Sequence, residues 1–131
     1  KISGNALKLP YADGHFDFVI MTSIVTHLPP DEVLVYLREV GRLLKPGGRL
    51  IYAVCPLTQT QTIDIVRAFT AAHPELEPAP VFPDSQPGSA GKFASPACAA
   101  GETDLYSETH VTLWPHQLDA NGMFLATWQK R

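Results

Sequence analysis

The chain contains little cysteine and no long hydrophobic run, and both shortages restrict what kind of protein it can be. Two of its 131 residues are cysteines, Cys55 and Cys98, too few for the disulfide framework of a small secreted domain. No apolar stretch approaches the ~18 residues that a membrane-spanning helix needs, and no signal peptide is recognisable. We therefore expect a cytoplasmic protein without a membrane partner.

Positive charge is also scarce. Ten Lys and Arg residues face 13 Asp and Glu residues, which gives a formal net charge of −3. A domain that binds nucleic acid by itself usually carries a basic face, so this balance disfavours a stand-alone nucleic-acid binder but allows an RNA enzyme whose basic surface lies in another segment. The chain begins with Lys1 rather than methionine, and we expect a fragment of a longer domain, with a short natural gene product as the alternative.

Two apolar runs separated by an amphipathic segment predict a pair of parallel strands. Phe16–Ile24 is almost continuously apolar, as expected of a strand covered on both faces. Pro30 suits the start of a helix, which ends at the turn Pro46–Gly48, and Arg49–Cys55 is the second apolar run. The helical stripe consists of Val33, Leu34, Leu37, Val40, Leu43 and Leu44. A strand–helix–strand crossover of this kind is almost always right-handed, with parallel strands.

A second amphipathic helix and a long irregular segment follow. Thr58–Gln61 has the spacing of a capping box and is expected to open a helix that ends near His73. Residues 75–109 are rich in Pro, Ala, Gly and Ser without a sustained period, which predicts a long loop. This loop is either a lid over a substrate or a surface excursion.

The last part of the chain regains strand character. His110–Trp114 and Met123–Trp128 predict two antiparallel strands, joined through a loop that contains Asn121 and Gly122. The pattern over residues 1–131 therefore predicts the C-terminal part of a single α/β domain. Its sheet is expected to be partial and Rossmann-like, with parallel strands and a C-terminal antiparallel hairpin.

Ligands of open α/β sheets bind beyond the carboxyl ends of the parallel strands, which selects two short segments here. Thr22–Leu28 leaves the first strand, and Cys55–Thr58 leaves the second. Because the crossover places both segments at one edge, we expect Cys55 and His27 to be near neighbours. These two residues are the candidates for catalysis.

Cys55 ends a strand just before an expected helix N-terminus, where the helix dipole favours a reactive thiolate. A thiolate is a nucleophile suited to addition across an electron-poor ring. The alternative, a small buried apolar cysteine, is the commoner role of such a residue. His27 could act as a base or orient a substrate, or it could be merely structural. The histidines and cysteines have no metal-ligand spacing, so we expect no metal.

Three stretches resemble the second half of class I methyltransferases. They are Asn5–Val19, with its Phe-Asp-x-Val strand, Thr26–Leu28, and Leu43–Leu50, with its Leu-Lys-Pro-Gly-Gly helix end. The resemblance implies S-adenosylmethionine as cofactor, with Asn5 and Ala6 at its adenine side and Thr22 as a further contact. The glycine-rich loop and acidic ribose ligand of that family would precede Lys1, so we expect weak cofactor binding by this chain alone.

The region from Tyr52 onward is similar to a narrower group, the Sun-type ribosomal-RNA cytosine-C5 methyltransferases. The similarity is carried by Tyr52–Thr58, Leu113–His116 and Asn121–Ala126. In that family the cysteine closing this strand attacks C6 of cytosine, which implies the same role for Cys55. Thr22–Val25 departs from the family's Asp-Ala-Pro-Cys segment, and the chain there looks more like small-molecule methyltransferases.

Three functions remain open from the sequence. The first is RNA cytosine-C5 methylation with Cys55 as nucleophile. The second is methylation of a small molecule, in which Cys55 only packs and His27 or another residue does the work. The third is a non-catalytic α/β module that associates with a partner or forms a homodimer through an exposed sheet edge.

Overall fold

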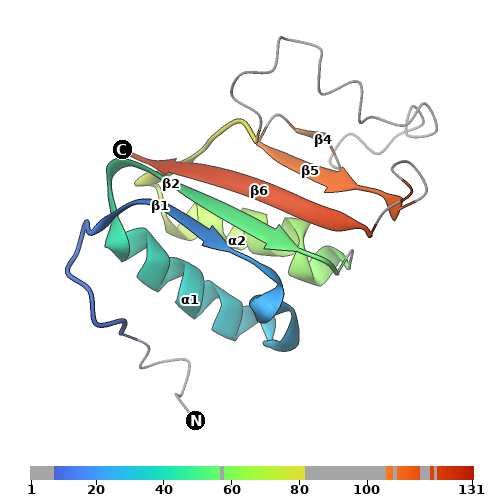
Figure 1. Cartoon of the computed structure of the whole chain (residues 1–131), viewed down its shortest axis with the longest axis horizontal. Helices are drawn as coiled ribbons and strands as arrows, with labels where there is room; N and C mark the ends of the chain where they lie inside the picture. The colour runs from blue at the N-terminus through green and yellow to red at the C-terminus, as the bar shows by residue number, and fades with distance from the viewer. Residues whose placement is uncertain (1–7, 57, 82–105, 108, 116–118, 120) are drawn as a thin grey trace.

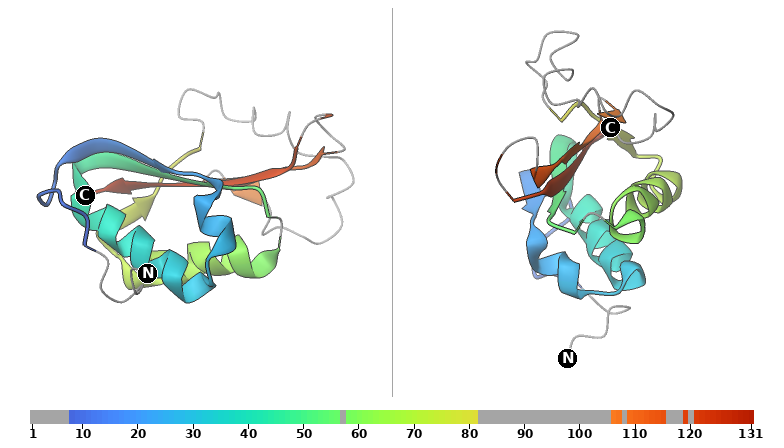
Figure 2. Two further views of the ribbon diagram at one scale, coloured as in Figure 1. Left: turned by 60° about the horizontal axis from the view of Figure 1, so that its bottom comes forward. Right: turned by 90° about the vertical axis from the view of Figure 1, so that its right-hand side faces the viewer.

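The computed structural model describes residues 8–56, 58–81, 106–107, 109–115, 119 and 121–131. Its elements, in chain order, are β1 (Phe16–Met21), η2 (Ser23–His27), α1 (Pro30–Leu43), β2 (Leu44–Val54), η3 (Gln59–Gln61), α2 (Ile63–Ala72), β3 (Leu76–Pro78), β4 (Tyr106–Ser107), β5 (His110–Leu113) and β6 (Met123–Lys130). The strands form one mixed sheet in the order β1-β2-β6-β5-β4, with β3 also paired to β6 (Figure 1). Both α-helices lie against the same face of this sheet (Figure 2).

The two strands predicted from the apolar runs are parallel neighbours. The register of β1 on β2 includes Val19 opposite Leu50 and Met21 opposite Tyr52, with α1 as the crossover between the strands. Their carboxyl ends therefore meet at one edge of the sheet, as Figure 1 shows. The structure confirms the predicted partial Rossmann-like arrangement.

The passage from α1 into β2 is tighter than the sequence predicts. Leu44 already has extended backbone and begins β2, so Pro46–Gly48 belongs to the strand rather than to a separate turn. Gly47 has a φ of 79°, and a Cβ added to Gly48 would lie 2.8 Å from the carbonyl oxygen of Lys45. Gly47 thus permits the left-handed backbone, and Gly48 permits a close approach in which a side chain would clash, at the place where the register of β1 on β2 shifts.

The predicted antiparallel pair at the end of the chain is confirmed. β5 pairs with β6 from His110 opposite Ala126 to Leu113 opposite Met123, and β6 also pairs antiparallel with β2. In the loop between these strands Asp119 has left-handed backbone, with a φ of 49°, whereas Asn121 and Gly122, a pair that readily takes such backbone, do not. β3 lies within the segment that was expected to be a loop and pairs with the end of β6.

The core fills the space between the sheet and the two helices. Phe69 of α2 and Trp128 of β6 are both buried, and their rings meet edge to face with centroids 5.0 Å apart. Trp128 also donates its indole N–H to the hydroxyl of Thr70 at 3.0 Å. Such a pair fixes α2 against the sheet through apolar burial and one satisfied polar group.

Two apolar side chains of β1 are more exposed to solvent than the apolar sequence of this strand predicts. Phe18 and Ile20 are each 52% exposed. In the described part of the chain, β1 is an edge strand, paired with β2 alone. None of the described helices is long and apolar enough to cross a membrane.

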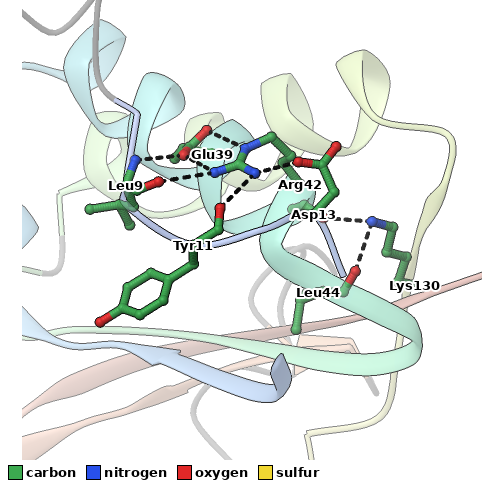
Figure 3. Close-up of polar contacts among 8 residues, drawn as sticks. Leu9, Tyr11, Asp13, Glu39, Arg42, Leu44 and Lys130 are labelled. Atoms are coloured by element: carbon green, nitrogen blue, oxygen red, sulfur yellow. Dashed lines mark hydrogen bonds and ion pairs between the residues drawn. The ribbon is translucent and has the colours of Figure 1, made fainter. Parts of the chain in front are cut away.

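The segment that leads into β1 is held by a polar cluster at the C-terminal end of α1, hereafter the Arg42 clamp (Figure 3). Arg42 donates from Nε to Glu39 at 2.9 Å and from Nη1 to the carbonyl oxygen of Tyr11 at 3.1 Å, and it forms an ion pair with Asp13. Glu39 in turn accepts a hydrogen bond from the backbone N–H of Leu9 at 2.8 Å. The clamp thus ties residues 9–13 to the helix.

Electrostatics strengthen both ends of this junction. The hydrogen bond from Arg42 lowers the pKa of Glu39 to about 2, against the opposing effect of burial. Lys130 donates from Nζ to the carbonyl oxygens of Gly41 at 2.9 Å and Leu44 at 2.8 Å. A cation at this position satisfies helix-end carbonyls and complements the negative end of the dipole.

We predict that Phe69→Ala destabilises the protein by about 3–5 kcal/mol, because it removes a fully buried ring from a packed core. The matched control is Phe18→Ala, the same chemical change at a half-exposed site, which should cost less than about 1 kcal/mol. Urea denaturation followed by circular dichroism measures both. Equal losses in the two variants would contradict the packing described.

The Arg42 clamp predicts a pH dependence of stability. The pKa of Glu39 lies below its ordinary value of 4.5, so its stabilising contribution is present above pH 4.5 and is lost as the pH falls toward 2. The free energy of unfolding should therefore fall more over this range in the native protein than in Glu39→Gln. Glu32→Gln, on the first turn of the same helix and outside the clamp, is the control, and an unchanged slope in Glu39→Gln would refute the prediction.

Candidate functional site

A serine hydroxyl and a cysteine thiol are in contact at the carboxyl ends of β1 and β2. The hydroxyl oxygen of Ser23, which follows β1, lies 3.0 Å from the sulfur of Cys55, which follows β2, and either group can donate the hydrogen bond. The two residues are 32 positions apart in the sequence. The prediction that Cys55 opens onto the edge formed by residues 22–28 is therefore confirmed.

Cys55 is exposed and is a free thiol. Its exposure contradicts the alternative of a small buried cysteine that only packs. The expected helix N-terminus directly after it is wrong, however, because α2 begins only at Ile63. Thr62 has non-helical backbone, with φ −120° and ψ −96°, and donates its hydroxyl to the carbonyl oxygen of Thr58 at 2.8 Å. A short 3-10 turn, η3, thus takes the place of the predicted helix start.

A chain of hydrogen bonds supports Ser23 from behind. The hydroxyl of Thr26 donates to the carbonyl oxygen of Ser23 at 2.7 Å, and the side-chain amide of Gln61 donates to the carbonyl oxygen of Thr26 at 3.2 Å. Tyr52 of β2 donates its hydroxyl to the carbonyl oxygen of Gln61 at 2.9 Å, and burial raises the pKa of this tyrosine to about 12. The segment that follows β1 is therefore linked by hydrogen bonds to Tyr52, a buried residue of β2.

The remaining predicted site residues divide into two groups. His27 is the last residue of η2 and is exposed, but within the described residues the hydrogen-bond partner of Cys55 is Ser23 and not His27. Thr22 is exposed directly beyond β1. The candidates Asn5 and Ala6 lie outside the described residues.

Sequence reasoning missed Ser23 as a member of the site. The segment Thr22–Leu28 was selected as a whole, and the pairing of one hydroxyl in it with Cys55 depends on the register of β1 against β2. A hydroxyl placed two residues after a strand end is the signal that was present. Among the described residues, no group of three or more His, Cys, Asp or Glu side chains is placed to hold a metal ion.

Part of the chain matches a known protein family. Residues 1–52 match the family model described as a methyltransferase domain. This match includes β1, α1 and most of β2, and it ends before Cys55. The part of the chain that forms the parallel pair is thus methyltransferase-like in sequence.

Two curated relatives illustrate the two kinds of similarity in the chain. One, from Bacillus subtilis, is a probable ribosomal RNA small subunit methyltransferase B, 26% identical over 98 residues, covering 75% of this chain and 19% of the relative. Another, a demethylmenaquinone methyltransferase from Halalkalibacterium halodurans, is 41% identical over 64 residues, covering 49% and 24%. The chain therefore spans about a quarter or less of the length of these relatives.

A solved structure shares the fold. The crystal structure of a methyltransferase homolog protein from Pyrococcus horikoshii matches 89% of this chain and 40% of that chain, with a TM-score of 0.60 and 19% identity. The cofactor of class I methyltransferases is S-adenosylmethionine. Residues 1–52 are thus similar in sequence to a methyltransferase domain, most of the chain is similar to a probable ribosomal RNA methyltransferase, and the match to the solved structure shows a shared fold.

Proposed function

We propose that this chain is part of an S-adenosylmethionine-dependent methyltransferase that acts on C5 of cytosine in RNA, ribosomal RNA in particular, with Cys55 as the nucleophile. The observation that carries the proposal is the exposed thiol at the carboxyl end of β2, on the edge where open α/β sheets bind ligands. The similarity to a probable ribosomal-RNA methyltransferase over most of the chain supports the choice of substrate.

The chemistry requires a nucleophile because C5 of cytosine is not reactive enough by itself. Attack of the Cys55 thiolate on C6 forms an S–C6 bond and moves an electron pair to C5, which then takes the methyl group. S-adenosylmethionine, when bound, supplies that methyl group as an electrophile. Loss of the proton from C5 and cleavage of the S–C6 bond restore the aromatic ring and the thiolate. His27, on the same edge, is our candidate for the base or for a group that orients the cytosine.

One candidate contact for the cofactor lies among the described residues. Thr22 is exposed at the end of β1 and offers a hydroxyl that can donate or accept a hydrogen bond at the same edge as Cys55. We propose that Thr22 contacts S-adenosylmethionine and that Asn5 and Ala6 lie at its adenine, as the resemblance implies. The Arg42 clamp supports this arrangement, because it fixes Leu9 and the segment that follows these two residues.

A second candidate function, methylation of a small molecule, has its own support. The demethylmenaquinone methyltransferase is more similar in identity over its shorter match than the ribosomal-RNA relative is. Thr22–Val25 also lacks the Asp-Ala-Pro-Cys segment of the Sun-type family. In this function Cys55 would not bond to the substrate.

Association through the sheet edge stays a prediction. In the described residues β1 carries an edge with no strand beside it, and Phe18 and Ile20 are exposed on that strand. Such an edge can pair with another chain, including a second copy of this one. This feature supports the non-catalytic alternative, in which Cys55 does no chemistry, and it supports a homodimer, which is compatible with a reactive Cys55.

We predict that an RNA containing 5-fluorocytosine forms a covalent adduct with the protein at the full length that its gene encodes. With S-adenosylmethionine supplied, C5 carries a methyl group and a fluorine after the transfer and has no proton to lose, so elimination stops and the S–C6 bond persists. Cys55→Ser should abolish the adduct, whereas Cys98→Ser, which changes the other cysteine, should leave it intact. Denaturing gel electrophoresis of labelled RNA measures the result.

The same experiment separates the two enzymatic functions. An adduct that survives Cys55→Ser, or the absence of any adduct from a protein that binds S-adenosylmethionine in calorimetric titration, would contradict RNA cytosine methylation through Cys55. Methyl transfer to a small aromatic acceptor by the Cys55→Ser protein would establish the second function instead.

A further inference from the structure

We propose that Ser23 is a positioning residue for Cys55, whose hydroxyl orients the sulfur and stabilises its thiolate. The inference rests on the proposed function of Cys55 and deepens it. It starts from the 3.0 Å contact between the Ser23 hydroxyl oxygen and the Cys55 sulfur, two side chains that leave neighbouring parallel strands. Neither the family match nor the strand pattern assigns a role to this serine.

The contact is built into the fold from both sides. Parallel pairing of Met21, the last residue of β1, with Tyr52, near the end of β2, fixes the two strands that lead to Ser23 and to Cys55. The carbonyl oxygen of Ser23 accepts the hydroxyl of Thr26 at 2.7 Å, which holds the turn that carries the serine. Because the same turn also accepts a hydrogen bond from Gln61, a shift of the serine would disturb its contact with η3, the turn that follows β2.

The chemical state of the sulfur decides the direction of the hydrogen bond. A thiol can donate or accept, but a thiolate only accepts, so Ser23 must donate when Cys55 is ready to attack. Hydrogen bonds to a charged acceptor are stronger than those between neutral groups. The serine therefore favours the thiolate form of Cys55. Its hydroxyl bonds to one lone pair of the sulfur, which leaves the exposed side of the sulfur for the substrate.

The same donor acts when the S–C6 bond breaks. The electron pair of that bond returns to sulfur, and a thiolate leaves more readily when its negative charge is stabilised. Ser23 is placed to stabilise the departing thiolate by the hydrogen bond that it gives before attack. The serine itself neither gains nor loses a proton in either step.

The test measures alkylation of Cys55 by iodoacetamide as a function of pH, in a Cys98→Ser background that leaves one thiol. Ser23→Ala should move the midpoint of the rate profile upward by about half to one pH unit, a three- to tenfold lower rate below the midpoint, because a charge-assisted hydrogen bond is lost. Ser23→Thr keeps the hydroxyl and should restore most of the native profile. Thr60→Ala, an exposed hydroxyl on η3, is the matched control and should change nothing.

The outcomes are distinct. A Ser23→Ala profile that coincides with that of Thr60→Ala, in a variant whose circular dichroism is native, would overturn the positioning role. Since alkylation needs neither RNA nor cofactor, a shifted profile without an adduct on 5-fluorocytosine RNA would refute the proposed function alone. An adduct without a shifted profile would refute the role of Ser23 alone.

Discussion

The parallel hydrogen-bonded pairing of β1 with β2 is the constraint on which the structure of the site depends. In an antiparallel pair the two strand ends would lie at opposite edges of the sheet, and the chain after β1 would never meet the chain after β2. With parallel strands, α1 carries the chain back along the sheet, and Ser23 and Cys55 arrive at the same edge. The reactivity that we assign to Cys55 begins with this geometry.

Both ends of β1 are fixed, and by different kinds of contact. At its amino end the Arg42 clamp holds the lead-in segment through an ion pair, side-chain hydrogen bonds and backbone groups. At its carboxyl end, η2 is bonded to Gln61 and to Cys55. The side chains of Phe18 and Ile20 on β1 are exposed. The contacts at the two ends of the strand nevertheless keep its register on β2. These two sets of contacts therefore hold the carboxyl end of β1, where the candidate site lies, in place.

Local sequence signals predicted the framework, and tertiary contacts decided the rest. The apolar runs and Pro30 were enough to place β1, α1 and β2, because burial and helix geometry impose their periods directly on the sequence. β2 begins directly at Leu44, and this depends on close packing at Gly48. α2 begins only at Ile63, and this depends on the hydrogen bond of the Thr62 hydroxyl. No local pattern in the sequence reveals either contact. The contact of Ser23 with Cys55 is likewise a result of strand register.

Disulfide trapping tests the placement of the site most directly. In a Cys98→Ser background, Ser23→Cys puts a second thiol where a hydroxyl now lies 3.0 Å from the Cys55 sulfur, within reach of ordinary disulfide geometry after a small adjustment. Mild oxidation should therefore remove both free thiols in the monomer. A thiol introduced by Ala12→Cys, before β1 at the far end of the strand, should leave Cys55 free. If the Ser23→Cys protein keeps both thiols as Ala12→Cys does, the two strand ends do not meet and the account fails.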